Sequence, residues 1–346
     1  MKRWLIGTLL CLIFGSITIA AWIAVTARRS DRIQNQSFLP NEVERLRDPR
    51  PYEAFEWIDR VAYSNDGTNV AASYNKIIEV WKTQTPGGEP VCKLIGHGDR
   101  VWGIAFSPDD KYIASASEDQ TVRLWNKSTT KEIRQFERVD RAPRDVCFSP
   151  DGSLLAATVF RRIQIWSVET GKIVKEIDDW GEGAGAYESV VFSLDGATIW
   201  ASAESSDFAI KAWNVASGER VRVPVIPSAR ESGKLARSEN GRWIVIGEQQ
   251  TISCWDTTSG ACLWSHRAHE AMNHYDVAIS RDGSKAIQQS QFLQMWDVPT
   301  GKELWRFNIS RPRSIMTSAA FSPDGNFVVT GDDGGSVRIW RVPKQE

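Results

Sequence analysis

One short stretch of this chain holds residue types that often do chemistry in proteins. His97, Ser115 and Asp119 lie in one short stretch, and a serine, a histidine and a carboxylate that are hydrogen-bonded in that order can activate the hydroxyl as a nucleophile. The alternative is that the three groups only satisfy one another's hydrogen bonds in a core, as buried polar groups must. The choice depends on the elements that position them.

A second candidate is a histidine cluster. His266, His269 and His274, three of the four histidines, lie in the sequence SHRAHEAMNHYD, and their spacing could suit a metal ion. The competing interpretation is that His269 is a structural histidine, because Ala268-His269 falls one residue from the place where Gly96-His97 occurs in another repeat of the chain. We therefore expect no metal ion and no cofactor.

The five cysteines give little support to chemistry. Cys11 lies in an apolar N-terminal segment, while Cys92, Cys147, Cys254 and Cys262 lie in predicted strands without CxxC spacing. We expect the last four to be small buried apolar side chains. The alternative is a disulfide between Cys254 and Cys262, which could face each other across one hairpin.

The elements that hold these residues form a repeat. Between Leu94 and Trp125, three alternating apolar runs separated by turn residues predict three short antiparallel strands, at Val101–Phe106, Tyr112–Ala116 and Val122–Trp125. The opening turn of this unit recurs at intervals of 42 to 45 residues at Ser64, Ser107, Ser149, Ser193, Ser238, Ser280 and Ser322. Each serine is followed by a tryptophan that ends an apolar run, namely Trp81, Trp125, Trp166, Trp213, Trp255, Trp296 and Trp340.

A repeat of this length, with Gly96-His97 near its start and Trp255-Asp256 or Trp296-Asp297 near its end, resembles the WD-repeat family of β-propellers. The resemblance implies an all-β, seven-bladed β-propeller of four-stranded antiparallel blades over residues 51–346. The last unit lacks a fourth strand of its own, so an N-terminal strand must close the ring. We expect Tyr52–Trp57 to supply it.

The resemblance also assigns the candidate triad. In the family, the third-strand tryptophan, a second-strand serine, the histidine of Gly-His and a turn aspartate form a hydrogen-bonded chain, which maps onto Trp125, Ser115, His97 and Asp119. We therefore expect a structural network, no catalytic residues and no enzyme activity. Six residues before the tryptophan, the other units carry Asn75, Phe160, Asp207, Gln249, Ser290 and Gly334, with Asp333 adjacent in the last unit. Most blades must then rely on apolar packing.

An enzyme remains an alternative because of two segments. TGKELW at Thr300–Trp305 and SGACLW at Ser259–Trp264 resemble the tryptophan-docking motif of quinoprotein dehydrogenase propellers. The same sequences also suit a hairpin turn between a third and a fourth strand, in which glycine adopts a positive φ. The chain has no adjacent pair of cysteines, so we favour the hairpin interpretation.

The N-terminal residues predict attachment to a membrane. Trp4–Ala27 carries no charge and lies between Lys2-Arg3 and Arg28-Arg29, and this length is enough to cross about 30 Å of hydrocarbon as a helix. We expect residues 1–29 to form a single-pass anchor, with a cleaved signal peptide as the alternative. Residues 30–50 are polar and predict a flexible linker. The balance of flanking charge favours, by a small margin, a propeller outside the cytoplasm.

Charge and length exclude other classes. The net charge is −1, with both signs evenly mixed, so the chain lacks the basic footprint of a nucleic-acid-binding protein. A propeller is one closed ring, and the repeats leave no residues for a second core. We expect a monomeric propeller.

Aligning the repeats gives a ring of equivalent positions, and the resemblance implies a binding surface there, because partners of WD-repeat propellers usually dock at this end. Five residues before each turn serine lie Asp59, Trp102, Arg144, Glu188, Gly233, Tyr275 and Thr317. Arg100, seven residues before its serine, belongs to the same end of the ring. Aromatic residues beside arginine and carboxylates are typical of binding hot spots. The alternative is that Trp102 and Tyr275 only pack against neighbouring blades.

These patterns favour a membrane-tethered, non-enzymatic platform that binds unknown protein partners through the loops at this end of the propeller. Two alternatives stay open. One is a cofactor- or metal-binding propeller enzyme similar to a quinoprotein. The other is an envelope assembly factor or sensor that binds a peptide or a glycan.

Overall fold

The computed structural model describes eleven segments of the chain: residues 42–47, 57–84, 89–136, 140–178, 185–203, 210–221, 234–247, 251–267, 276–289, 292–308 and 316–343. The predicted membrane anchor, at residues 1–29, lies outside the described residues. Within the described segments, no helix has the length and apolar character needed to cross a membrane.

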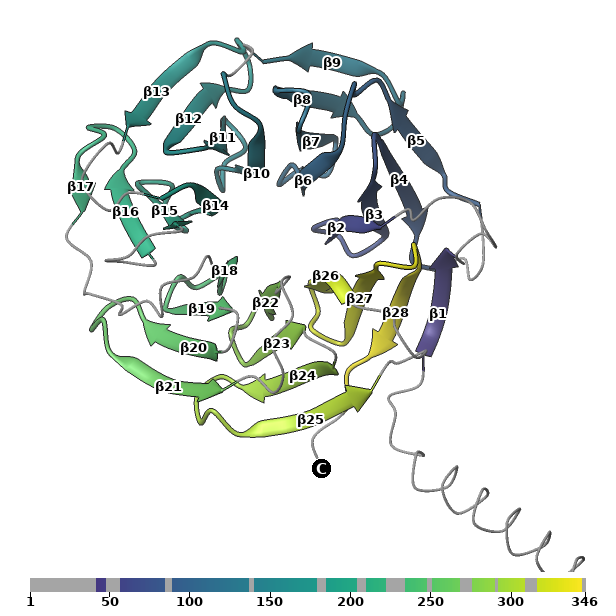
Figure 1. The fold of residues 1–346 in the computed structure, drawn as a ribbon, viewed down its shortest axis with the longest axis vertical. Coiled ribbons are helices and arrows are strands. Elements are labelled where there is room, and N and C mark those ends of the chain that lie inside the picture. The colour runs from purple at the N-terminus through teal and green to yellow at the C-terminus, as the bar shows by residue number, and fades with distance from the viewer. Residues whose placement is uncertain are drawn as a thin grey trace, which may run out of the picture. The chain divides into compact units, whose positions relative to one another are not determined.

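The described residues form a ring of seven four-stranded antiparallel sheets (Figure 1). Blade 1 contains β2 (Ile58–Tyr63), β3 (Asn69–Tyr74), β4 (Ile77–Lys82) and β5 (Cys92–Ile95). Blade 2 contains β6 (Val101–Phe106), β7 (Tyr112–Ser117), β8 (Thr121–Asn126) and β9 (Glu132–Gln135). Blade 3 contains β10 (Pro143–Phe148), β11 (Leu154–Val159), β12 (Arg162–Ser167) and β13 (Ile173–Asp178). Blade 4 contains β14 (Tyr187–Phe192), β15 (Thr198–Ala203), β16 (Ile210–Asn214) and β17 (Arg220–Val221).

The remaining three blades complete the ring. Blade 5 contains β18 (Lys234–Arg237), β19 (Trp243–Gly247), β20 (Thr251–Asp256) and β21 (Cys262–Arg267). Blade 6 contains β22 (Val277–Ile279), β23 (Lys285–Gln289), β24 (Phe292–Asp297) and β25 (Glu303–Asn308). Blade 7 contains β26 (Met316–Phe321), β27 (Phe327–Asp332), β28 (Val337–Arg341) and β1 (Glu42–Arg47). This confirms the predicted seven-bladed, all-β propeller, with the seven repeated tryptophans on third strands.

Each blade packs face to face against its neighbours, and the core lies at these junctions. The second strands are buried almost completely, as in β3 and β7, because both of their faces are covered. The outer strand β9 is mostly exposed. One apolar cluster joins Ile163 and Ile177 of blade 3 to Tyr187 and Val190 of blade 4, and burial of such side chains stabilises the fold by about 1.5 to 3 kcal/mol each.

The ring is closed by a different segment from the one predicted. β1 pairs with β28, with Glu42 opposite Trp340, and Leu46 joins the apolar cluster between blades 7 and 1. The prediction that an N-terminal strand closes the ring is confirmed, but its placement at Tyr52–Trp57 is wrong. Because β2 starts at Ile58, a closing strand that ended at Trp57 would leave no residues to return from the rim to the innermost strand. β1 also lies inside the predicted linker, residues 30–50.

The repeated serine has a local explanation in the turn between the first and second strands. In blade 3, the Ser149 hydroxyl donates to Asp151 at 2.5 Å and accepts from the Leu154 amide at 2.9 Å. Gly152 adopts a φ of 74°, a conformation that costs glycine little. The turn therefore fixes the register of the two inner strands at one end of each blade, which we call the turn end. The opposite end, where the fourth strand connects to the next blade, is called the loop end.

Candidate functional site

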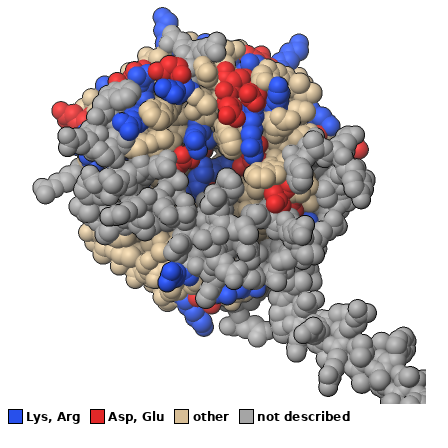
Figure 2. Space-filling model, in the orientation of Figure 1, with Lys and Arg blue, Asp and Glu red and all other residues tan. Residues whose placement is uncertain are grey.

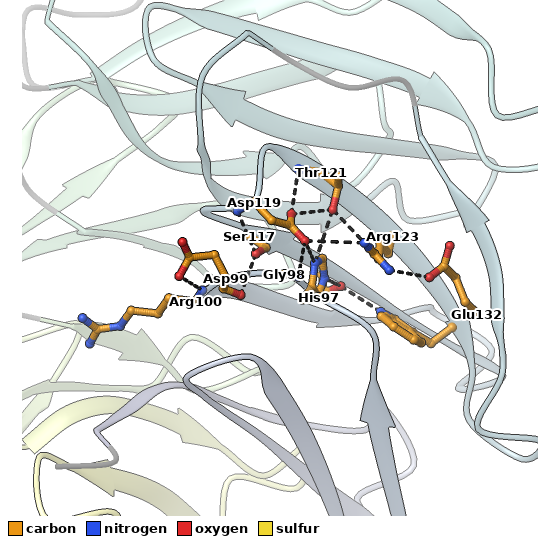
Figure 3. Close-up of polar contacts among 11 residues, drawn as sticks. His97, Gly98, Asp99, Arg100, Ser117, Asp119, Thr121, Arg123 and Glu132 are labelled. Atoms are coloured by element: carbon orange, nitrogen blue, oxygen red, sulfur yellow. Dashed lines mark hydrogen bonds and ion pairs between the residues drawn. The ribbon is translucent and has the colours of Figure 1, made fainter. Parts of the chain in front are cut away.

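The candidate triad is one hydrogen-bonded chain in blade 2 (Figure 3). His97 Nδ1 lies 2.8 Å from Asp119 Oδ2, and His97 Nε2 lies 2.7 Å from Ser115 Oγ. Trp125 Nε1 donates to the same Ser115 oxygen at 2.8 Å. The structure thus brings together all four residues of the predicted network, and it joins the loop entering the blade to its second and third strands.

The surroundings of Asp119 favour its ionised form. Burial acts to raise the pKa of Asp119, but hydrogen bonds from His97, Thr121 and the Gly98 amide outweigh it and hold the pKa well below its usual range. Ser115 is fully buried, and its oxygen is already bonded to His97 and Trp125. A substrate has no access to this hydroxyl, so the geometry supports a structural role and not a nucleophile.

The network varies in the other blades. In blade 7, Trp340 donates to Thr330 at 2.9 Å, and the turn carboxylate is Asp332, which accepts from the Ser336 amide at 2.8 Å. In blades 3 and 6, the indole nitrogens of Trp166 and Trp296 are buried and have no hydrogen-bond partner among the described residues.

The described residues include no candidate metal site. They contain no group of three or more His, Cys, Asp or Glu side chains placed to hold a metal ion. The His266 ring stacks on Trp296 with the ring centres 4.5 Å apart, and its Nε2 donates to the Gly301 carbonyl at 2.7 Å. Ring packing therefore already accounts for His266. The other two histidines of the cluster, His269 and His274, lie outside the described residues.

The cysteines that the structure describes are free thiols, including Cys254 and Cys262, which were the alternative disulfide. Burial raises the pKa of Cys254 to about 12 and that of Cys92 to about 11. Because the thiolate is the reactive form, these two side chains act as apolar fillers.

The segment that resembles a tryptophan-docking motif has a packing role. Trp264 lies against the turn of the next blade, where a Cβ on Gly301 would approach its ring to 2.5 Å, and its Nε1 donates to the Val298 carbonyl at 2.6 Å. In other blades the same position carries Arg134, which donates to the Thr170 carbonyl at 2.7 Å, and Lys175. An arginine and a lysine fill the same place, so this contact is a general link between blades.

The predicted binding residues share one backbone feature. The first strand carries a β-bulge at this position in blades 1, 2, 3, 4 and 7, at Asp59, Trp102, Arg144, Glu188 and Thr317. A bulge leaves one residue unpaired and turns its side chain out of the regular alternation. Tyr275 and Gly233, the members in blades 6 and 5, lie outside the described residues.

The bulge residues of blades 1 and 2 form a cluster with Arg100. The Arg100 Nε donates to Asp59 Oδ1 at 2.7 Å, and its guanidinium lies 4.2 Å from the ring centre of Trp102 and 5.5 Å from that of Trp57. We call Trp57, Asp59, Arg100 and Trp102 the cation–aromatic cluster. Arg100 and Trp102 are partly exposed, whereas the Asp59 side chain is only 2% exposed. Burial raises the pKa of Asp59 although the Arg100 ion pair acts to lower it.

The other predicted residues also join neighbouring blades. Arg144, with 56% of its side chain exposed, pairs with Glu188 at 3.0 Å, and the Thr317 hydroxyl donates to the Ile58 carbonyl. Contacts between blades therefore already engage the polar groups of Asp59, Glu188 and Thr317. Among the described members of the predicted set, Arg100 and Trp102 are partly exposed and Arg144 is largely exposed, so these three offer surface to a partner.

The sequence analysis did not predict one polar network, which lies among the first strands. Arg60 forms ion pairs at 3.3 Å with both Asp145 of blade 3 and Asp276 of blade 6, and Ser318 donates to Asp276 at 2.8 Å. Burial acts to lower the pKa of Arg60, and the Asp276 and Asp145 carboxylates outweigh it and raise that pKa. Figure 2 shows Lys and Arg side chains beside the centre of the ring. Aligning the positions four residues before each serine would have revealed these charges.

The ring and its network define a class of protein. Seven four-stranded blades with repeated third-strand tryptophans, and a His–Ser–Asp–Trp hydrogen-bond chain in blade 2, are the features of a WD-repeat-type seven-bladed β-propeller. Residues 57–341 match the family described as the IFT122 first beta-propeller. The chain belongs to that family.

Curated relatives share the repeats at low identity. The chain is 26% identical over 321 residues to apoptotic protease-activating factor 1 of Rattus norvegicus, a match that covers 80% of this chain and 24% of that protein. It is 24% identical over 287 residues to eukaryotic translation initiation factor 3 subunit I of Coccidioides immitis, covering 79% and 72%. The small ribosomal subunit protein RACK1 of Neurospora crassa is 28% identical over 175 residues, covering 47% and 52%. The chain thus spans only about a quarter of the length of apoptotic protease-activating factor 1.

Proposed function

We propose that this chain is a non-enzymatic platform for protein–protein interaction, held at a membrane by its N-terminal segment, that binds partners through the loop end of the propeller. The observation that carries the proposal is the cation–aromatic cluster. It places a partly exposed arginine within 5.5 Å of the centres of two indole rings, one of which, Trp102, lies at a strand bulge on the ring of blades. Tryptophan and arginine are the residues most enriched at binding hot spots.

The cluster suits binding better than catalysis. Arg100 is oriented by Asp59 beneath it and by Trp102 beside it, so little side-chain entropy is lost when a partner covers it. Ser115, the hydroxyl that lies beside His97 at this end, is fully buried and already bonded to His97 and Trp125. Two relatives have names that describe parts of larger assemblies, an initiation factor subunit and a ribosomal subunit protein, which supports a role in assembly.

The membrane tether belongs to the same proposal and rests on sequence. Trp4–Ala27 is uncharged and long enough to span a bilayer, and we place the propeller outside the cytoplasm. Removing residues 1–29 leaves β1 in the chain, so the shortened protein should fold and stay in solution while the full chain partitions with membranes. Extraction of the full-length protein by alkaline carbonate would contradict the tether.

The experiment that tests the platform compares two similar clusters at opposite ends of the propeller. Arg242 lies 4.3 Å from the ring centre of Trp243 and pairs with Asp256 at 3.4 Å, as Arg100 does with Trp102 and Asp59, but it follows a turn between first and second strands. Arg242→Ala is therefore a matched control for Arg100→Ala.

Partners are first identified by affinity purification of the full chain from detergent-solubilised membranes, and their binding to purified variants is then measured. We expect Arg100→Ala, Trp102→Ala and Arg144→Glu each to weaken the main interaction by more than about 1 kcal/mol, with melting temperatures within a few degrees of wild type. Arg242→Ala should leave binding intact. If Arg242→Ala abolishes binding and the loop-end changes do not, the assigned face is wrong.

A further inference from the structure

Blade 3 carries a second exposed aromatic residue at the loop end, and two arginines cover it. Phe160 lies in the turn between β11 and β12 and is 39% exposed. The guanidinium of Arg141 lies 5.3 Å from the centre of its ring, and that of Arg161 lies 5.5 Å from it. We call Arg141, Phe160 and Arg161 the arginine–phenylalanine patch.

The two guanidiniums lack carboxylate partners among the described residues. Nearby acidic groups are already engaged, since Arg162 pairs with Asp178 at 2.7 Å and with Glu176 at 3.3 Å. The Nε atom of Arg161 is buried without a hydrogen-bond partner. Guanidinium groups form their strongest contacts with carboxylates or phosphates, so the patch presents two donors that no carboxylate of the described residues satisfies.

The backbone beneath the patch adds an independent observation. Phe160 adopts a φ of 54°, in the left-handed region. Asn75 occupies the corresponding turn of blade 1 with a φ of 50°, and asparagine tolerates this conformation far better than a bulky residue does. Residues held in such a conformation cluster at functional sites. An exposed phenylalanine is thus kept where folding alone favours asparagine or glycine.

The patch is continuous with the proposed binding face. The Tyr187 amide donates to the Phe160 carbonyl at 2.6 Å, and the next residue, Glu188, pairs with the exposed Arg144. In the strand register, Pro143, adjacent to Arg144, lies opposite Val159. A third arginine therefore lies on the same side of blade 3. Figure 2 shows Lys and Arg side chains over the blades of the upper half of the ring, interspersed with acidic ones.

We propose that the arginine–phenylalanine patch binds an acidic peptide segment of a partner protein. Aspartate or glutamate carboxylates of the segment bond to Arg141 and Arg161, and an apolar side chain of the same segment covers the edge of Phe160. The assignment rests on the proposed function, because it names the kind of partner that this face takes. Two carboxylates of one segment neutralise the two guanidinium groups one for one.

Fluorescence polarisation with short labelled peptides tests the assignment on the purified full-length chain in detergent. The probe is a peptide of glutamates around a central leucine, compared with the same peptide carrying glutamines and with one carrying phosphoserines. We expect the glutamate peptide to bind, the glutamine peptide to bind at least about tenfold more weakly, and binding to weaken as salt is raised from about 0.05 M to about 0.5 M.

Variants locate the binding. Changing Arg141→Gln and Arg161→Gln together should weaken the glutamate peptide by about tenfold or more, and Phe160→Asn by about threefold or more. Arg341→Ala is the matched control, because Arg341 lies 5.4 Å from the ring centre of Phe327 at the turn end; it should leave binding unchanged. Equal effects of Arg341→Ala and the double change, or binding of the phosphoserine peptide alone, would overturn the assignment.

The acidic-peptide assignment and the platform proposal can fail independently of each other. If no acidic peptide binds while Trp102→Ala still weakens the purified partner, the platform stands and the acidic-peptide assignment fails. If the peptide binds at the patch and no loop-end change affects any partner, the patch is a peptide site and the wider platform fails.

Discussion

Blades 2 and 3 are neighbours with the same four-stranded architecture, yet different interactions hold their third-strand tryptophans in place. In blade 2, Ser115 receives a hydrogen bond from Trp125 and another contact from His97, which Asp119 orients. In blade 3, Ala157 takes the place of the serine and Trp166 Nε1 has no partner. Blade 3 relies instead on apolar packing, in which Trp166 lies against Phe136 with the ring centres 5.5 Å apart.

The difference shows that the polar network is optional for the fold and constrains the loop end where it is present. Asp119 must reach back to His97, so the turn of blade 2 between β7 and β8 is committed to structure. In blade 3 the turn has only Phe160 and Arg161 between its strands and makes no such bond. The backbone of this turn is bonded to blade 4, because the Phe160 carbonyl accepts from the Tyr187 amide, but its side chains make no bond like that of Asp119 and can contact a partner.

The largest expected effect is the loss of the network in blade 2. We expect His97→Ala or Asp119→Ala to lower the free energy of unfolding by about 1 to 3 kcal/mol, because each change leaves buried polar partners unpaired. Urea titration measures this loss. Arg161→Ala in the corresponding turn of blade 3 should lower the free energy of unfolding by less than about 0.5 kcal/mol. A similar loss in both blades would show that the two turns do not differ in their contribution to stability.

The same network gives a pH dependence of defined sign. The pKa of Asp119 is lowered by folding, so above the unfolded value of about 3.9 the ionised carboxylate contributes stability, and this is lost as pH falls towards the folded pKa. The difference in unfolding free energy between wild type and Asp119→Asn should therefore shrink below about pH 4. A difference that stays constant from pH 7 to pH 3 would show that the charge of Asp119 contributes nothing.

Some features of the propeller can be predicted from the sequence and others cannot, for physical reasons. The serine turns and third-strand tryptophans recur in register because each fixes local strand pairing, so the blades and the His97 chain were predictable. β1 was not, because outer strands such as β9 bury few side chains and carry little apolar pattern. The Arg60 contacts to Asp145 and Asp276 join blades far apart in sequence and exist only once the ring closes.

A smaller effect should follow from restoring part of the network in blade 3. Ala157 occupies the position of Ser115, eight residues after the turn serine, and Trp166 occupies that of Trp125. Ala157→Ser should give the buried Trp166 Nε1 an acceptor and raise the free energy of unfolding by about 0.5 to 1 kcal/mol. The indole absorption and fluorescence of Trp166 should change with it. Destabilisation beyond about 1 kcal/mol would mean that the core of blade 3 has no room for the hydroxyl.

The smallest expected effect separates function from stability at Phe160. A bulky side chain in the left-handed region costs about 1 kcal/mol more than asparagine does there, and the ring contacts with two arginines that are lost on replacement lie at a partly exposed position. Phe160→Asn should therefore leave the free energy of unfolding unchanged or raise it by up to about 0.5 kcal/mol, while it weakens the acidic peptide. If Phe160→Asn raises the free energy of unfolding while it weakens peptide binding, then Phe160 serves binding and not stability. A loss of stability above about 1 kcal/mol would instead show that Phe160 packs the blade, and that blade 3, like blade 2, uses its turn for structure.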